Sequence, residues 1–211
     1  VRVGGSFAYR GDFEVAACAN ESDRKGVAAT TDRFLFISGG VGINPLFSMI
    51  QQCLVDQTEK NAKNSRAMLV YSGRDRDGLL FVDQLVKLMN EKPRQFRVIL
   101  TTTQGQKILN GATNSLKEKA GKCQSDMALF KEGRIELEMI RDAVNWLNQP
   151  EHVNGIDTPN RGGHVNEHGH DMLADAVFIC GPPGMPESMM KILSEEKLVR
   201  SPNDVHFEKW W

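Results

Sequence analysis

Hydrophobic residues gather along this chain into short, nearly continuous runs that alternate with longer segments of mixed character. Four runs are apolar at almost every position, which is typical of strands buried on both faces of a parallel sheet; they are Phe34–Ile37, Ala67–Tyr71, Phe96–Leu100 and Ala176–Cys180. Apolar residues three and four positions apart predict helices at Leu46–Leu54, Leu79–Asn90, Glu136–Leu147 and Glu187–Leu198. Val205–Glu208 predicts a short last strand. The alternation predicts an α/β fold with a doubly wound parallel five-stranded sheet.

Three segments interrupt this pattern. Residues 1–31 contain one short predicted strand followed by a small, polar and charged linker. A strand without a partner is not stable alone, so it indicates the end of a domain whose beginning is missing. Polar insertions near 104–131 and 149–172 predict long loops, the first with a weak helix. The predicted organisation is therefore a leading segment, 1–31, and a main domain, 32–211.

The second insertion is rich in histidine, and its histidines are His152, His164, His168 and His170. The last three have the spacing H-x-x-x-H-x-H, which is compatible with a metal site. No cysteine or carboxylate-rich frame accompanies them, and this favours a solvated loop over a metal centre. The sequence therefore predicts no metal site.

Composition narrows the class of protein. The chain has 211 residues and a formal net charge of −1, so it lacks the basic character of a nucleic-acid-binding protein. No apolar run approaches the roughly 20 residues of a membrane-spanning helix. The cysteines lie far apart without a C-x-x-C pair, at Cys18, Cys53, Cys123 and Cys180. They indicate thiols in a reducing, intracellular compartment.

A glycine turn follows the first predicted strand. Gly39, Gly40 and Gly42 end the apolar run, Asn44 is a good helix N-cap, and Pro45 suits the first helical position. Glycines allow the backbone to approach a ligand closely, and a helix N-terminus favours an anion such as a pyrophosphate. No Lys-Ser or Lys-Thr follows, so the turn is not a Walker loop, and Pro45 stands where a third glycine would complete G-x-G-x-x-G. A purely structural strand-to-helix turn is the alternative.

A second turn, Gly181–Gly184, follows the fourth predicted strand. In a doubly wound sheet the first and fourth strands can be neighbours where the strand order reverses, and ligands bind at that crevice. Cys180 would then face the crevice; the alternatives are a buried small hydrophobic residue or, with less support, a reactive thiol. Trp210 and Trp211 end the chain and are expected to dock on its own surface or on a flat aromatic ring.

Three motifs carry a resemblance to a known family: Gly39–Pro45, Cys180–Met185 and the tail Phe207–Trp211. Together they resemble the NAD(P)-binding domain of the ferredoxin–NADP reductase superfamily, and Asn44 and the tail are especially similar to one group within it. The resemblance implies a flavin-binding β-barrel before this domain, of which Val1–Tyr9 would be the last remnant. The arginine-aromatic-serine motif with which this superfamily grips flavin does not occur in the sequence.

The resemblance also implies roles for individual residues. The pyrophosphate would be held by Gly39, Gly40, Val41, Gly42, Ile43, Asn44 and Pro45. The rest of the nucleotide would lie along Ser72, Arg74, Thr101, Gly181, Pro182, Pro183 and Met185. Cys180 would lie beside the reactive carbon of the nicotinamide, with Glu208 near that centre. Trp210 would stack on the flavin, although the extra Trp211 leaves open which indole does so.

The activity that this resemblance implies is hydride transfer from NAD(P)H to FAD and on to an unknown electron acceptor. A non-catalytic nucleotide-binding or interaction module that lacks a flavin domain is the alternative. The neutral segment Thr101–Gln104 favours NADH, while Arg74 and Arg76 keep NADPH open. A mitochondrial location is suggested by the resemblance alone.

Overall fold

The structure is a computed structural model, and it describes residues 33–55, 65–75, 77–104, 129–149, 152–153, 156–157 and 173–209. The predicted barrel remnant and linker at 1–31 lie outside these residues. So do most of both insertions, Arg76, and the two terminal tryptophans.

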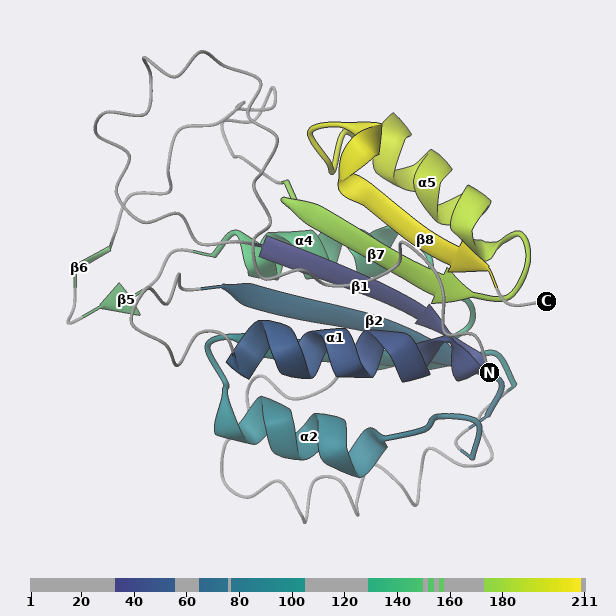
Figure 1. The fold of residues 1–211 in the computed structure, drawn as a ribbon, viewed down its shortest axis with the longest axis horizontal. Coiled ribbons are helices and arrows are strands. Elements are labelled where there is room, and N and C mark those ends of the chain that lie inside the picture. The colour runs from purple at the N-terminus through teal and green to yellow at the C-terminus, as the bar shows by residue number, and fades with distance from the viewer. Residues whose placement is uncertain are drawn as a thin grey trace.

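A six-stranded parallel sheet forms the centre of the molecule, with the strand order β4-β3-β2-β1-β7-β8 (Figure 1). Its strands are β1 (Arg33–Gly39), β2 (Arg66–Gly73), β3 (Phe96–Thr102), β4 (Leu129–Glu132), β7 (Ala176–Gly181) and β8 (Val205–Lys209). Successive strands are added on one side of β1 from β2 to β4 and on its other side from β7 to β8, so the strand order reverses between β1 and β7. The two strands pair in parallel from Phe34 with Ala176 to Ser38 with Cys180, which confirms the predicted neighbours.

Helices cover both faces of the sheet, as a doubly wound fold requires (Figure 1). They are α1 (Ile43–Val55), α2 (Val82–Glu91), α4 (Leu137–Leu147) and α5 (Met185–Glu195). Alternate residues of β1 point to opposite faces: Phe34 and Phe36 join the core under α1 and α2, while Leu35 and Ile37 join the core under α4 and α5. This double burial explains why the central strands are apolar at every position.

The fold class is as predicted, but the sheet has six strands and not five. The additional strand, β4, lies at the end of the insertion near 104–131, which was expected to be a loop. It is short, it contains Lys131 and Glu132, and it pairs only with β3. An edge strand of this kind has no need of a continuous apolar run. The second insertion also contains a small hairpin, β5 (His152–Val153) with β6 (Ile156–Asp157).

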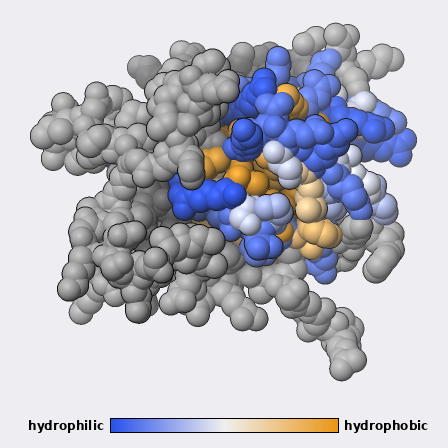
Figure 2. Space-filling model, turned by 90° about the horizontal axis from the view of Figure 1, so that it is seen from above, coloured by the Kyte–Doolittle hydropathy of each residue, from blue (hydrophilic) through white to orange (hydrophobic). Residues whose placement is uncertain are grey.

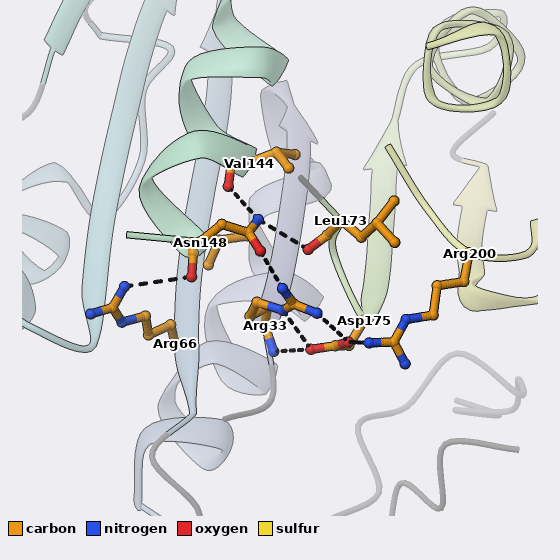
Figure 3. Close-up of polar contacts among 8 residues, drawn as sticks. Arg33, Arg66, Val144, Asn148, Leu173, Asp175 and Arg200 are labelled. Carbon is orange, nitrogen blue, oxygen red and sulfur yellow. Dashed lines mark hydrogen bonds and ion pairs between the residues drawn. The ribbon is translucent and has the colours of Figure 1, made fainter. Parts of the chain in front are cut away.

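A polar network joins the amino ends of the central strands (Figure 3). Arg33, the first residue of β1, donates from Nε to Oδ2 of Asp175 at 3.0 Å, and Arg200 contacts Oδ1 of the same carboxylate at 2.9 Å. Arg33 also donates to the side chain of Asn148. Arg66, the first residue of β2, donates to the carbonyl of Gln149 at 2.6 Å, next to the C-terminus of α4. Arg33 and Arg66 lie at the C-terminus of α4, where the negative end of the helix dipole favours cations.

The surface that the described helices expose is mostly polar, because each of these helices turns its apolar side toward the sheet. Figure 2 shows one face on which hydrophilic residues surround a smaller hydrophobic area. Among the residues that the structure describes, no helix is long and apolar enough to cross a membrane.

Candidate functional site

The glycine turn lies at the carboxyl end of β1, beside β7. Gly39 ends the strand, residues Gly40–Gly42 form a single turn of 3-10 helix, and α1 begins at Ile43. Gly40 has φ +55°, a left-handed conformation that glycine adopts without strain. The side chain of Val41 is 56% exposed, so the outer side of the turn faces solvent.

At Gly42 the turn is packed so tightly against β7 that a side chain has no room. A β-carbon added to Gly42 would lie 2.1 Å from the carbonyl oxygen of Cys180. One added to Gly39 would lie 2.7 Å from Sδ of Met185 and from Cδ of Pro182, and one added to Gly181 would lie 2.4 Å from the same sulfur. The two turns that the sequence predicts to share a crevice are therefore in direct contact.

The N-terminus of α1 is suited to an anion. Its first turn contains no acidic residue, so no carboxylate of its own competes for the amide groups there. Asn44 lies inside the helix and donates from Nδ2 to the carbonyl of Val41 at 2.9 Å. The predicted N-cap role of Asn44 is therefore wrong: its side chain satisfies a carbonyl of the glycine turn and leaves the helix amides to other partners. Pro45 is correspondingly the third helical residue and not the first.

The second turn continues from β7 into α5. Cys180 is completely buried and lies in register with Ser38 of β1 and Glu208 of β8. Pro182 and Pro183 are exposed, and Met185 begins the helix half-buried against the glycine turn. Glu208 is partly exposed on β8, the strand next to the one that contains Cys180. Trp210 and Trp211 lie outside the described residues.

The turns after β2 and β3 lie along the same edge of the sheet. Gly39 is in register with Ser72, and Ser72 with Thr101. Ser72 is partly exposed, whereas Thr101 is buried and donates its hydroxyl to the carbonyl of Gly133 at 2.7 Å. The Thr101 side chain is thus engaged within the fold. Arg74 is exposed and donates from Nε to Oε1 of Gln104 at 3.0 Å.

Tyr71 shapes this edge, although the sequence pattern did not single it out. It is fully buried, accepts a hydrogen bond from the Leu80 amide at 2.9 Å and donates to the Gly78 carbonyl at 3.2 Å. Burial raises the pKa of its phenol, and the Leu80 hydrogen bond partly offsets this. The hydroxyl therefore holds the turn after β2 against the sheet. An aromatic residue with a polar tip at the end of a buried strand was the available signal.

The residues that the structure describes contain no group of three or more histidine, cysteine, aspartate or glutamate side chains that could hold a metal ion.

The family model and the related proteins that match this chain point to the same family. The family described as oxidoreductase NAD-binding domain matches residues 36–191. Oxidoreductase NAD-binding domain-containing protein 1 of Bos taurus is 28% identical over all of this chain and 52% of its own length, and the Homo sapiens protein is 26% identical over all of the chain and 51% of its own length. The chain thus spans about half the length of these curated relatives. These relatives are the group to which the sequence analysis found Asn44 and the tail Phe207–Trp211 to be especially similar.

The structural comparison agrees with the sequence comparison. The cytochrome b5 reductase domain of Ulva prolifera nitrate reductase superposes with a TM-score of 0.53 at 16% identity, over 84% of this chain and 49% of that one. At this identity the likeness shows the fold alone. The fold in question is a doubly wound sheet, and in such sheets ligands bind where the strand order reverses, which in this chain is between β1 and β7.

Proposed function

Because the chain belongs to the family of oxidoreductase NAD-binding domains, we propose that it binds a nicotinamide dinucleotide at the carboxyl ends of β1 and β7. We further propose that it is the nucleotide-binding part of a flavin-dependent oxidoreductase. The electron acceptor of such an enzyme is unknown.

The observation that carries this proposal is the contact between the glycine turn and β7. The absence of any space for a β-carbon at Gly42 keeps the backbone of the turn close to Cys180 and Gly181. The exposed side of the turn then presents backbone groups and the positive end of α1 to solvent. A pyrophosphate fits this arrangement because it carries negative charge and needs several N–H donors. Backbone amides of the glycine turn and of Asn44 can supply them, whereas Pro45 has no N–H.

The remaining residues divide between the two ends of the dinucleotide. The turns after β2 and β3, with Ser72, Arg74 and Thr101, would lie along the adenosine half. The Cys180–Met185 turn would lie along the nicotinamide half. Glu208 is close enough in register to Cys180 to contribute there. Trp210 and Trp211 are assigned to the nicotinamide and flavin rings by the resemblance alone.

In the proposed reaction, nicotinamide supplies a hydride, which is two electrons and a proton, to a flavin such as FAD. The chain's own contribution is to bind, to orient and to exclude water. The proposal assigns Cys180 to the nicotinamide half, and in the structure its side chain is fully buried in the core under α1 and α2. No step requires a general base from this chain.

A charge placed on the glycine turn tests the proposal without disturbing the core. We would titrate the chain and its Val41→Asp and Val41→Asn variants with NADH and with NADPH by calorimetry. Asp and Asn are nearly the same size and the position is exposed, so the pair isolates the charge. We expect Val41→Asp to bind both nucleotides about five- to thirtyfold more weakly than Val41→Asn, since a like charge beside a phosphate costs about 1–2 kcal/mol. Equal affinities in the two variants would refute the placement of the pyrophosphate. No saturable binding by the unmodified chain would refute nucleotide binding itself.

A further inference from the structure

We propose that the thioether of Met185 is an oxidation site that controls nucleotide binding. Its conversion to the sulfoxide by a hydroperoxide loosens the contact between the two turns of the crevice and weakens the binding of the dinucleotide. The inference rests on the proposed nucleotide site and assigns a chemical control to that site.

Met185 lies where the two turns of the crevice meet. It is the first residue of α5, which follows β7 (Figure 1), and its amide donates to the Pro182 carbonyl at 3.1 Å. Its sulfur lies 2.7 Å from the position of a β-carbon on Gly39 and 2.4 Å from that of a β-carbon on Gly181. These glycines are the last residues of β1 and β7. One sulfur atom therefore fills the space that glycines of both strands leave open.

This contact supports the position of the glycine turn. A β-carbon on Gly181 would also lie 3.3 Å from the nitrogen and 3.4 Å from the α-carbon of Gly39, so the two backbones are close to one another beside the sulfur. A methionine side chain is unbranched and its sulfur is polarisable, which suits it to an irregular gap of this kind. The backbone that leads from β1 into the glycine turn and α1 thus packs directly on Met185.

The oxidation is balanced by the hydroperoxide alone. One oxygen of the hydroperoxide forms a bond to the Met185 sulfur while the O–O bond breaks, and the other oxygen leaves as water or as an alcohol. The sulfur gives up the two electrons that reduce the peroxide. The product has a polar, chiral sulfoxide in place of an apolar thioether.

Both positions open to the oxidised side chain disturb the junction. If the sulfur stays between the glycines, its new oxygen must fit beside backbone that leaves no room for a β-carbon, and such overpacking displaces backbone. If the side chain turns toward solvent, it leaves a gap between the two turns and their dispersion contacts are lost. In either case the glycine turn shifts, and its amides no longer meet the pyrophosphate in their original geometry.

Exposure separates Met185 from most other methionines of the chain. Met185 and Met190, both on α5, are partly exposed. The other methionines that the structure describes are only 4–6% exposed; they are Met49, Met68, Met89, Met139 and Met189. A small peroxide therefore has access to the two α5 residues before it reaches the core. Met190 lies more than one helical turn beyond Met185 and packs against the core under α4 and α5, which makes it a matched control.

The test compares nucleotide binding before and after mild treatment with hydrogen peroxide. The chain is titrated with NADH and with NADPH by calorimetry, and peptide mass spectrometry locates each sulfoxide. Sulfoxide at Met185 should weaken both nucleotides about tenfold, which corresponds to the loss of one hydrogen bond to a charged phosphate. The two methionine sulfoxide reductases, one for each sulfoxide epimer, should restore the affinity. A thiol reductant alone, which reverses the reversible oxidation of cysteine, should not restore it.

Matched variants assign the effect to one sulfur. Met185→Leu keeps an apolar side chain of similar size without the sulfur, so peroxide should leave its affinity unchanged, whatever value that affinity starts from. Met190→Leu should lose affinity on treatment to the same extent as the unmodified chain. Met185→Gln places a polar amide at the same position and should weaken binding without any peroxide.

Three results would overturn the inference and leave nucleotide binding intact. They are an unchanged affinity in a chain whose Met185 is fully oxidised, a peroxide effect that persists in Met185→Leu, and a sulfoxide that forms at Met190 but not at Met185. If the untreated chain binds neither nucleotide, the proposed function fails and the inference fails with it.

Discussion

Gly42→Ala adds one carbon atom at the tightest contact of the site. The new atom would lie 2.1 Å from the Cys180 carbonyl oxygen, 2.5 Å from its carbonyl carbon and 3.0 Å from the Gly181 nitrogen. Because these are backbone atoms, no flexible side chain can move aside. The glycine turn and β7 must separate by roughly 1 Å, which places the cost near the upper end of overpacking, about 3 kcal/mol of unfolding free energy.

The expected results concern both stability and binding. For a domain of this size a loss of about 3 kcal/mol lowers the melting temperature by roughly 6–12 °C. The same displacement misaligns the turn's amides with the pyrophosphate, and losing two charged hydrogen bonds weakens both nucleotides about a hundredfold. Thermal unfolding and calorimetric titration measure the two effects.

Gly40→Ala is the matched control for this substitution. Gly40 has φ +55° and open space around a β-carbon, so alanine there meets left-handed strain of about 1 kcal/mol and no clash. Gly42→Ala should therefore destabilise the chain more than Gly40→Ala does. If the Gly42→Ala variant has the same melting temperature and the same nucleotide affinity as the unmodified chain, the turn is not packed against β7.

Two further substitutions test the parts of the fold that frame the site. Asp175→Asn removes the charge of the carboxylate that Arg33 and Arg200 share. Because the Asp175 side chain is only 8% exposed, we expect denaturant unfolding to show a loss of about 3 kcal/mol in unfolding free energy, whereas the exposed control Glu91→Gln should show no measurable loss. Similar unfolding midpoints for the two variants would contradict a role of Asp175 in stability. Tyr71→Phe should cost about 1–2 kcal/mol through its two lost hydrogen bonds. Since burial raises the pKa of the folded phenol above its ordinary 10.0, the folded state keeps that proton longer, so stability from this group is complete below pH 10 and falls as the pH rises further. The Tyr71→Phe variant should lack this loss of stability at alkaline pH. If its stability depends on pH in the same way as that of the unmodified chain, this expectation is refuted.

The central strands could be predicted because burial on both faces leaves a direct mark on the sequence. β4 left none, since an edge strand containing Lys131 and Glu132 resembles the polar insertion around it. The start of α2 was also misplaced. Leu79 is buried like a helical residue, but Phe81 has φ +60° and the helix begins only at Val82. Tertiary packing of this turn, through Tyr71, decides the boundary.

The proximity of the two turns at the candidate site could be predicted from the sequence, and the contacts around them only partly. Two turns at the ends of strands that reverse the sheet order must meet, and they do. The network of Arg33, Asn148 and Asp175 joins residues 115 and 142 positions apart. No local pattern marks such pairs. The side-chain contact of Arg74 with Gln104, 30 positions away, was hidden for the same reason.

The glycines themselves have a different role from the one that their motif suggests. A glycine-rich turn is usually explained by the approach of a ligand, yet Gly42 is required by the approach of one part of this chain to the backbone of another. Within the motif Gly40 has open space around it, and Val41 and Asn44 are exposed. A substitution at Gly42 therefore measures packing and binding together. Substitutions at Val41 measure binding with little change in packing, so they decide the function where the motif glycines do not.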